Sequence, residues 1–165
     1  ETEIKHLREG GTGSESSSMM QPDFYPDKLE AGTHNLPGIA GLNAGLKYIL
    51  NKGTKSIYSH ENNLLDIFIN EMRKNHKIKI YGPEDINGRC GVVPVNIEEI
   101  DSSEVAYRLD TEYGIAVRPG LHCAPLAHKT IGTEKKGAVR FSVGPFNKKS
   151  DIMAAVKALD EISGI

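Results

Sequence analysis

The sequence is short, nearly neutral and free of long apolar runs. Its 165 residues carry 20 Lys and Arg against 22 Asp and Glu, which gives a net charge of −2 with both signs interspersed. This balance gives no electrostatic reason to expect nucleic acid or an anionic membrane as a partner. Neither a signal peptide nor an apolar span of membrane length is recognisable, so we expect a cytoplasmic protein with no membrane partner.

The two cysteines, Cys90 and Cys123, are too few for a disulfide framework. In a reducing compartment an isolated cysteine is more often catalytic or metal-binding than structural. Cys90 opens the apolar run 90–97, and we expect it to fill the core, where free cysteine is common.

The first 36 residues show no apolar periodicity and predict loops. Segment 10–18 consists of Gly, Thr, Ser and one Glu, and segment 32–38 is a second loop rich in glycine and polar groups. Thr33 and Asn35 in this second loop are suited to cap the helix that follows. The positive end of that helix dipole makes an anion beside the loop physically reasonable.

From residue 38 onward the spacing of apolar residues predicts helices alternating with strands. The expected helices are 38–52, 54–75, 101–112 and 150–162, and the expected strands are 77–81, 91–97, 114–118 and 138–143. Because proline cannot donate a backbone hydrogen bond, Pro94 indicates an edge strand or a bulge. The order of the elements predicts an α+β fold, a small and mostly antiparallel sheet with helices packed on one face.

The loop Arg118–Pro125 presents Cys123 directly after the apolar run 113–117. Gly120 permits a positive φ and two prolines remove backbone donors, so neither a helix nor a strand continues easily through the loop. The neighbouring Arg118 and His122 would favour the thiolate, which is the reactive form of cysteine. These features indicate a nucleophile, although a free cysteine is also a common core residue.

Four blocks of sequence stand out together. They are Glu9–Ser14 (EGGTGS), Leu29–Leu42 (LEAGTHNLPGIAGL), Arg118–Pro125 (RPGLHCAP) and Gly137–Asn147 (GAVRFSVGPFN). Taken in order and at these separations, they resemble the C-terminal portion of a cysteine desulfurase. These enzymes are fold type I proteins of the class V aminotransferase superfamily and depend on pyridoxal 5'-phosphate.

The resemblance implies that Cys123 takes sulfur from L-cysteine as a persulfide and that alanine is released. A further acceptor, either a protein or a thiol, then receives the sulfur. Arg140 matches the residue that pairs with the substrate carboxylate, and a planar guanidinium suits that task. Arg118 and His122 are implied to act beside it, at the substrate and at Cys123.

The resemblance also implies a cofactor end of the chain. Thr33 matches a threonine that reaches the cofactor phosphate of the partner subunit in a homodimer. Gly11 and Thr12 match the same interface region and are expected to be cofactor-binding residues.

The cofactor-bearing lysine of the family would lie just upstream of Glu1 and is not in this sequence. Lys129 follows the cysteine loop instead of preceding the glycine-rich block, so we expect it to be a surface lysine. The resemblance implies that 1–50 is the tail of a large cofactor-binding domain and 54–165 a small C-terminal α+β domain. By itself the chain is expected neither to retain pyridoxal phosphate nor to turn over.

Other functions stay open at this point. The same framework serves selenocysteine lyases, cysteine lyases and aminotransferases, although a thiol nucleophile favours sulfur or selenium transfer. A thiol carrier would need Cys123 alone. A metal-binding module could use His122, Cys123, His128 and Cys90, but the paired spacings of structural zinc sites are absent and we expect no metal.

Overall fold

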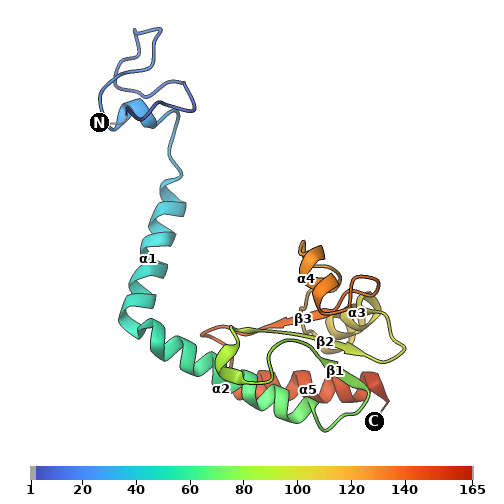
Figure 1. The fold of residues 1–165 in the computed structure, drawn as a ribbon. Coiled ribbons are helices and arrows are strands. Elements are labelled where there is room, and N and C mark those ends of the chain that lie inside the picture. The colour runs from blue at the N-terminus through green and yellow to red at the C-terminus, as the bar shows by residue number, and fades with distance from the viewer. Residues whose placement is uncertain (1–2, 165) are drawn as a thin grey trace. The chain divides into compact units, whose positions relative to one another are not determined.

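The computed structural model describes residues 3–164, which form two compact units divided between Asn51 and Lys52. The first unit consists of loops, the short 3-10 helix η1 (Asp27–Leu29) and helix α1 (Leu36–Lys52) (Figure 1). Every helix among the described residues is too short or too polar to cross a bilayer.

The loops of the first unit hold together through a few specific bonds. The N–H of Gly32 donates to the carbonyl of Gly11 (2.9 Å), and the buried Lys28 ammonium donates to Glu3 (3.1 Å). Asn35 accepts the N–H of Gly38 on its side-chain oxygen (3.0 Å), which confirms it as a capping residue of α1. The apolar stripe of α1 is exposed, and no residue of this helix is buried.

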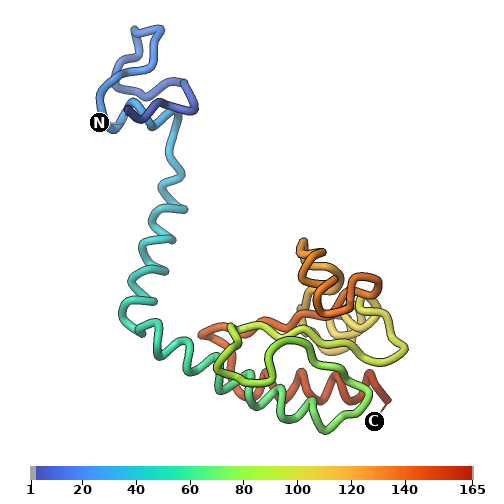
Figure 2. The backbone as a smooth tube through the Cα atoms, viewed as in Figure 1, coloured from blue at the N-terminus to red at the C-terminus, as the bar shows by residue number. Residues whose placement is uncertain are grey.

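The second unit is an α+β fold, as the sequence predicts. In chain order it comprises α2 (Thr54–Met72), β1 (Ile78–Ile80), η2 (Ile86–Gly88), β2 (Val92–Ile97), α3 (Ser102–Tyr113), α4 (Pro125–Thr130), β3 (Val139–Ser142) and α5 (Lys149–Ser163). The strands form an antiparallel sheet in the order β1-β2-β3, with Ile80 opposite Val95 and Pro94 opposite Arg140. Figure 2 traces the backbone from β2 through α3 to the cysteine loop and back along β3.

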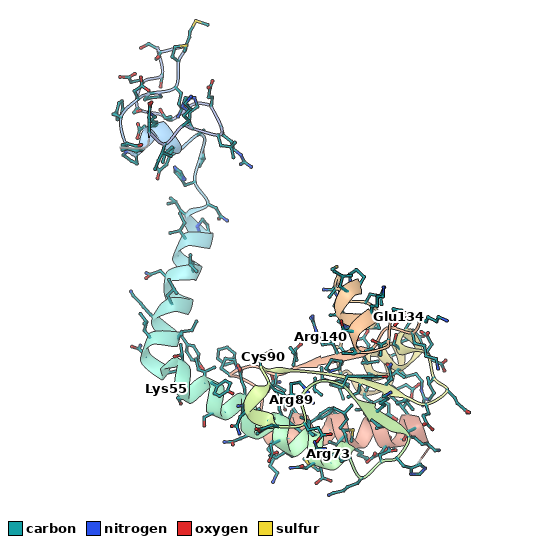
Figure 3. The ribbon with its side chains drawn as sticks, in the orientation of Figure 1. Lys55, Arg73, Arg89, Cys90, Glu134 and Arg140 are labelled. Atoms are coloured by element: carbon teal, nitrogen blue, oxygen red, sulfur yellow. The ribbon has the colours of Figure 1, made fainter. Side chains whose placement is uncertain are left out.

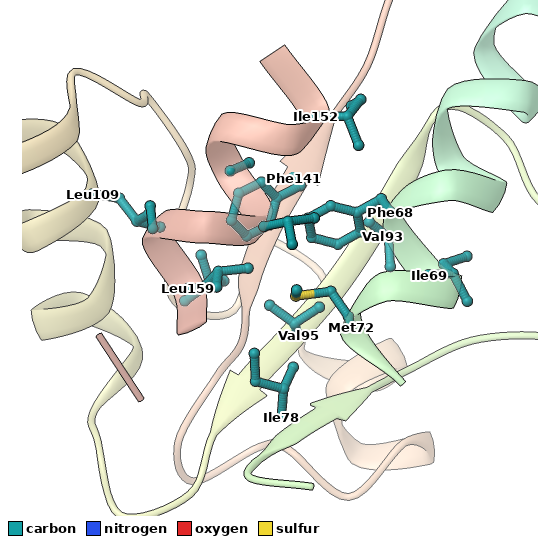
Figure 4. Close-up of a cluster of buried hydrophobic side chains, with 14 of the residues drawn as sticks. Phe68, Ile69, Met72, Ile78, Val93, Val95, Leu109, Phe141, Ile152 and Leu159 are labelled. Carbon is teal, nitrogen blue, oxygen red and sulfur yellow. The ribbon is translucent and has the colours of Figure 1, made fainter. Parts of the chain in front are cut away.

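The core lies between one face of this sheet and helices α2, α3 and α5. Alternate residues of β2 and β3 point into it, because successive side chains of a strand alternate between faces (Figure 4). The rings of Phe68 and Phe141 lie 5.0 Å apart at its centre. Arg140, between the inward Val139 and Phe141, therefore belongs to the opposite face of the sheet.

β2 is the central strand, so the prediction that Pro94 marks an edge strand or a bulge is wrong. The carbonyl of Pro94 accepts the N–H of Tyr81 (3.0 Å). In a regular antiparallel pair the residue at position 94 would also donate its N–H to the carbonyl of Tyr81, but proline has no N–H to donate. Arg89 Nη1 donates to that carbonyl instead (3.1 Å), and Arg89 Nε donates to the carbonyl of Pro83 (2.8 Å). A buried guanidinium thus replaces one bond of the β-ladder.

Residues 114–118 do not form the predicted strand. Arg118 alone pairs with β3, through a bridge to Arg140, and residues 114–116 and 142–143 instead line a cavity of about 410 Å³. The apolar side chains of Ile115 and Val117 pack against the core, which explains a strand-like pattern without strand pairing.

Cys90 is exposed, so the prediction that it fills the core is wrong. The inward positions of the adjoining strand are Val93, Val95 and Ile97. Cys90 precedes β2, and its carbonyl accepts the N–H of Val92, so the backbone turns at this point before the alternation of the strand begins.

The hydrogen bonds of Arg89 predict an effect on stability. Replacing Arg89 with Met removes both donors and keeps an apolar stem, so we expect the free energy of unfolding to fall by about 1–3 kcal/mol as the Tyr81 carbonyl loses its partner. Urea unfolding of Arg89→Met beside Arg73→Met, where an exposed arginine is replaced, measures the difference. Equal stability of the two variants would contradict this role.

Candidate active site

The first residues of the cysteine loop are hydrogen-bonded to the sheet or to its adjoining residue at both ends, at Arg118 and at Gly120. The backbones of Arg118 and Arg140 exchange two hydrogen bonds (3.3 and 2.8 Å), and the carbonyl of Gly120 accepts the N–H of Ala138 (3.1 Å). Gly120 has a φ of 91°. The loop therefore leaves the sheet at Arg118 and touches it again two residues later, before the cysteine is reached.

Cys123 lies in a tight turn with an unusual backbone. The N–H of Ala124 donates to the carbonyl of Leu121 (2.8 Å), and the two central residues, His122 and Cys123, have φ values of 53° and 57°. A positive φ at both central positions defines a type I′ turn, which normally carries Gly, Asn or Asp. Each residue with a Cβ costs about 1–2 kcal/mol in this region, so the surroundings must hold the turn in place.

The imidazole of His122 provides one of these restraints. Its Nε2 lies 2.8 Å from the carbonyl of Arg118, which can only accept, so Nε2 carries the proton and donates. The Nδ1 of His122 is then an acceptor, and it faces Nε2 of His128 at 3.2 Å. The Nδ1 of His128 lies 2.7 Å from the hydroxyl of Thr133.

The protonation of His122 agrees with this assignment. Burial lowers the pKa of His122 below its ordinary value, and the positive charges of Arg140 and Arg118 and the neighbouring His128 act in the same direction. The hydrogen bond to the Arg118 carbonyl opposes these effects without overcoming them. His122 is therefore neutral at physiological pH, as an accepting Nδ1 requires.

The thiol of Cys123 is exposed and has a charged partner. Arg118 Nη2 lies 3.3 Å from Sγ, within the range of an N–H···S hydrogen bond. A guanidinium donor stabilises a thiolate better than a thiol, and the thiolate is the nucleophile. Figure 3 shows Arg140 projecting from β3 on the same side of the sheet as α4, and its Nε is buried without a hydrogen-bond partner among the described residues.

Two glycines meet where the loop returns to the sheet. Gly137 has a φ of 65°, and a Cβ built on it would lie 2.6 Å from the Cα of Gly120. No side chain fits in this contact, so Gly137 fixes the distance between the loop and the start of β3.

The second group of predicted site residues lies in the first unit. Gly11, Thr12, Gly32 and Thr33 line an open hollow of about 590 Å³. The hydroxyl of Thr33 makes no hydrogen bond to another residue within 3–164, and the hollow adjoins the first turn of α1. Free hydroxyls, glycine backbone and a helix N-terminus are groups that suit a phosphate.

The sequence-predicted residues thus fall into two sets, one in each unit. Cys123, Arg118, His122 and Arg140 gather in the second unit, and Gly11, Thr12 and Thr33 gather in the first. Lys129 is exposed on α4, as expected for a surface lysine. No group of three or more His, Cys, Asp or Glu within residues 3–164 is placed to hold a metal.

The sequence analysis missed the structural roles of His128 and Thr133. Both are 3% exposed; His128 contacts His122 from α4, and Thr133 contacts His128 from the turn after α4. A histidine and a threonine in a short polar segment carry no signal of burial, so only the fold reveals the contact.

The Gly137 contact predicts a large cost for one methyl group. Gly137→Ala is destabilised by a positive φ and by a backbone clash. Gly132→Ala is destabilised by a positive φ alone, since a Cβ there meets open space. We expect Gly132→Ala to lose about 1 kcal/mol of unfolding free energy and Gly137→Ala at least twice as much. Urea unfolding of both variants tests this, and equal losses would contradict it.

The lowered pKa of His122 predicts a pH dependence of stability. Between its folded pKa and its ordinary value of 6.5 the unfolded chain binds more protons, so stability is full above that value and falls as the pH drops below it. In urea unfolding from about pH 7.5 to 5.5, His122→Gln should lose less stability than the parent chain. His76→Gln, at an exposed histidine, serves as the control, and parallel curves for parent and His122→Gln would contradict the assignment.

The comparisons with known proteins agree on one family. The sequence model of the family Aminotransferase class-V matches residues 1–154. A probable cysteine desulfurase of Staphylococcus epidermidis is 36% identical over 136 residues, which cover 82% of this chain and 32% of that protein. A probable cysteine desulfurase of Methanothermobacter thermautotrophicus is 34% identical over 143 residues, which cover 86% and 35%.

The solved structures agree in fold. The apo structure of a cysteine desulfurase from Thermococcus onnurineus NA1 matches with a TM-score of 0.75 and 31% identity, over 84% of this chain and 34% of that chain. The present chain spans about a third of the length of the curated relatives it matches. The family match over most of the sequence and the shared fold confirm the resemblance noted from the four blocks: the chain belongs to the class V aminotransferase family.

Proposed function

We propose that this chain is the nucleophile-bearing part of a cysteine desulfurase that takes sulfur from L-cysteine. The observation that carries the proposal is the exposed Sγ of Cys123, held on a strained turn 3.3 Å from the guanidinium of Arg118. The relatives named probable cysteine desulfurases support it. Because these relatives are longer, we propose a longer parent enzyme, and within it we assign 1–50 to the tail of the large domain and 54–165 to the small domain.

In the proposed reaction the thiolate of Cys123 attacks the sulfur of L-cysteine. A sulfur–sulfur bond forms while the carbon–sulfur bond of the substrate breaks, and the electron pair of the broken bond stays with carbon, which takes up a proton. L-Cysteine and the Cys123 thiol thereby become alanine and a Cys123 persulfide. A thiol or a sulfur-acceptor protein then removes the outer sulfur, in a cytoplasmic setting.

Arg140 is suited to hold the substrate carboxylate. Its backbone is fixed by the bridge to Arg118, and its buried Nε still has a donor to offer. A guanidinium binds a carboxylate through two parallel N–H···O bonds, which fixes the orientation of the ligand as well as its position. The free Nε is therefore an argument that a planar anion completes this site.

The hollow in the first unit is suited to the phosphate of the cofactor. The residues that would bind the phosphate there are Gly11, Thr12 and Thr33. In a homodimer, Thr33 would bind the phosphate of the cofactor held by the partner subunit. Pyridoxal phosphate, on which the class V aminotransferase family depends, supplies an electron sink that weakens bonds in the bound amino acid. The cofactor-bearing lysine would come from the rest of the parent enzyme, so we infer that this chain alone neither retains the cofactor nor turns over.

The two exposed cysteines offer a matched test. In the complete product of the reading frame, supplied with pyridoxal phosphate and L-cysteine, Cys123→Ala should lower alanine release at least about 100-fold, because the covalent step loses its nucleophile. Cys90→Ala should retain the parent rate, and mass spectrometry should find persulfide on Cys123 only. Undiminished alanine release by Cys123→Ala would overturn the proposal in favour of lyase or aminotransferase chemistry.

A further inference from the structure

We propose that Thr133 and His128 are positioning residues, which hold the turn of Cys123 through a chain of hydrogen bonds that begins at a buried Thr133–His128 pair and ends at Arg118. The chain runs from the Thr133 hydroxyl to His128, to His122 and to the Arg118 carbonyl, over distances of 2.7, 3.2 and 2.8 Å. The consequence for catalysis rests on the proposed function above, whereas the consequence for the thiol does not.

The direction of donation along these three hydrogen bonds is fixed at the Arg118 carbonyl. The Arg118 carbonyl can only accept, so His122 donates to it from Nε2 and must accept at Nδ1. His128 then donates from Nε2, and as a neutral ring it accepts at Nδ1 from the Thr133 hydroxyl. With both imidazoles neutral, one arrangement of protons satisfies all three bonds.

The far end of the chain is anchored as firmly as the near end. The N–H of Thr133 donates to the carbonyl of His128 (2.8 Å), and the carbonyl of Thr133 accepts the N–H of Gly137 (2.7 Å). Both side chains are 97% buried, so water has little access to replace a lost partner. The hydroxyl is thus placed by backbone bonds on either side of it.

The near end carries the cysteine. The Arg118 carbonyl also accepts the N–H of Arg140 (2.8 Å), so both of its lone pairs are used, one by the sheet and one by His122. His122 is itself a strained residue of the turn, next to Cys123. Holding this ring in place therefore holds the turn, and with it the 3.3 Å contact between Sγ and Arg118 Nη2.

Loss of the Thr133 hydroxyl leaves Nδ1 of His128 without a hydrogen-bond partner among residues 3–164. The His128 ring then loses the bond that orients it, so its bond from Nε2 to His122 is weakened. The turn loses a constraint, and Sγ leaves the guanidinium for part of the time. Thr133→Val removes the hydroxyl at nearly constant volume, while Thr133→Ser retains it.

The first experiment measures the thiol in the complete product of the reading frame. The protein is alkylated with iodoacetamide near neutral pH, and mass spectrometry follows the Cys123 and Cys90 peptides, with the exposed Cys90 as the internal reference. Thr133→Val should lower the Cys123-to-Cys90 rate ratio about fivefold, the factor expected for one buried hydrogen bond, and Thr133→Ser should stay within about twofold of the parent. An unchanged ratio in a folded Thr133→Val, or an equal drop in Thr133→Ser, overturns the proposal.

A second measurement does not depend on a variant of Thr133. In spectra of the protein with nitrogen-15-labelled histidine, assigned with His122→Asn and His128→Asn, both rings should carry their proton on Nε2. A proton on Nδ1 of His122 overturns the proposal, even where Thr133→Val fails to fold.

The kinetic readout separates positioning from the function itself. With L-cysteine as substrate, Thr133→Val should lower kcat for alanine release about fivefold and leave KM unchanged, in step with the alkylation ratio. A fall in kcat without a change in that ratio overturns the positioning role. If the parent protein releases no alanine, the proposed function fails, and the alkylation and tautomer measurements still decide the positioning.

Discussion

The antiparallel bridge between Arg118 and Arg140 is the constraint on which the candidate site depends. It brings the start of the cysteine loop into register with β3 and pairs Arg140 with Arg118, whose guanidinium contacts the Cys123 thiol. On the N-terminal side of Arg118 the segments part, and residues 114–116 and 142–143 line a cavity of about 410 Å³. The bridge and the bond between Gly120 and Ala138 therefore determine where the cysteine loop begins.

The periodicity of the sequence predicts most of the second unit because burial of an apolar face is what shapes it. The helices α2, α3 and α5 and the strands at 78–80, 92–97 and 139–142 follow the expected segments within a few residues. The failures arise where a specific contact, and not the alternation of apolar residues, decides the outcome: the Arg89 guanidinium allows Pro94 in a central strand, and packing replaces pairing at Ile115. The four sequence blocks single out Cys123 and Arg140 as candidate site residues, but the buried pair His128 and Thr133 is visible only in the fold.

The two units carry different kinds of chemistry. The first offers glycine backbone, free hydroxyls and a helix N-terminus, which are groups that neutralise an anion without reacting. The second offers an exposed thiol, which is a nucleophile once ionised, and two guanidinium groups, which bind anions. In the function proposed above, the cofactor phosphate and the reactive sulfur are accordingly held by different parts of the fold.

The anchors of the cysteine loop limit how far its sulfur can travel. The loop is bonded to Arg140 of β3 at Arg118 and to Ala138, just before β3, at Gly120. At its other end the carbonyl of Ala124 accepts the N–H of His128 in α4. With the backbone clamped on both sides, the reach of Cys123 reduces to rotation about one side-chain torsion. A reaction partner of this thiol must therefore be carried to the tip of the turn, because the loop is too short a tether to carry the sulfur to it.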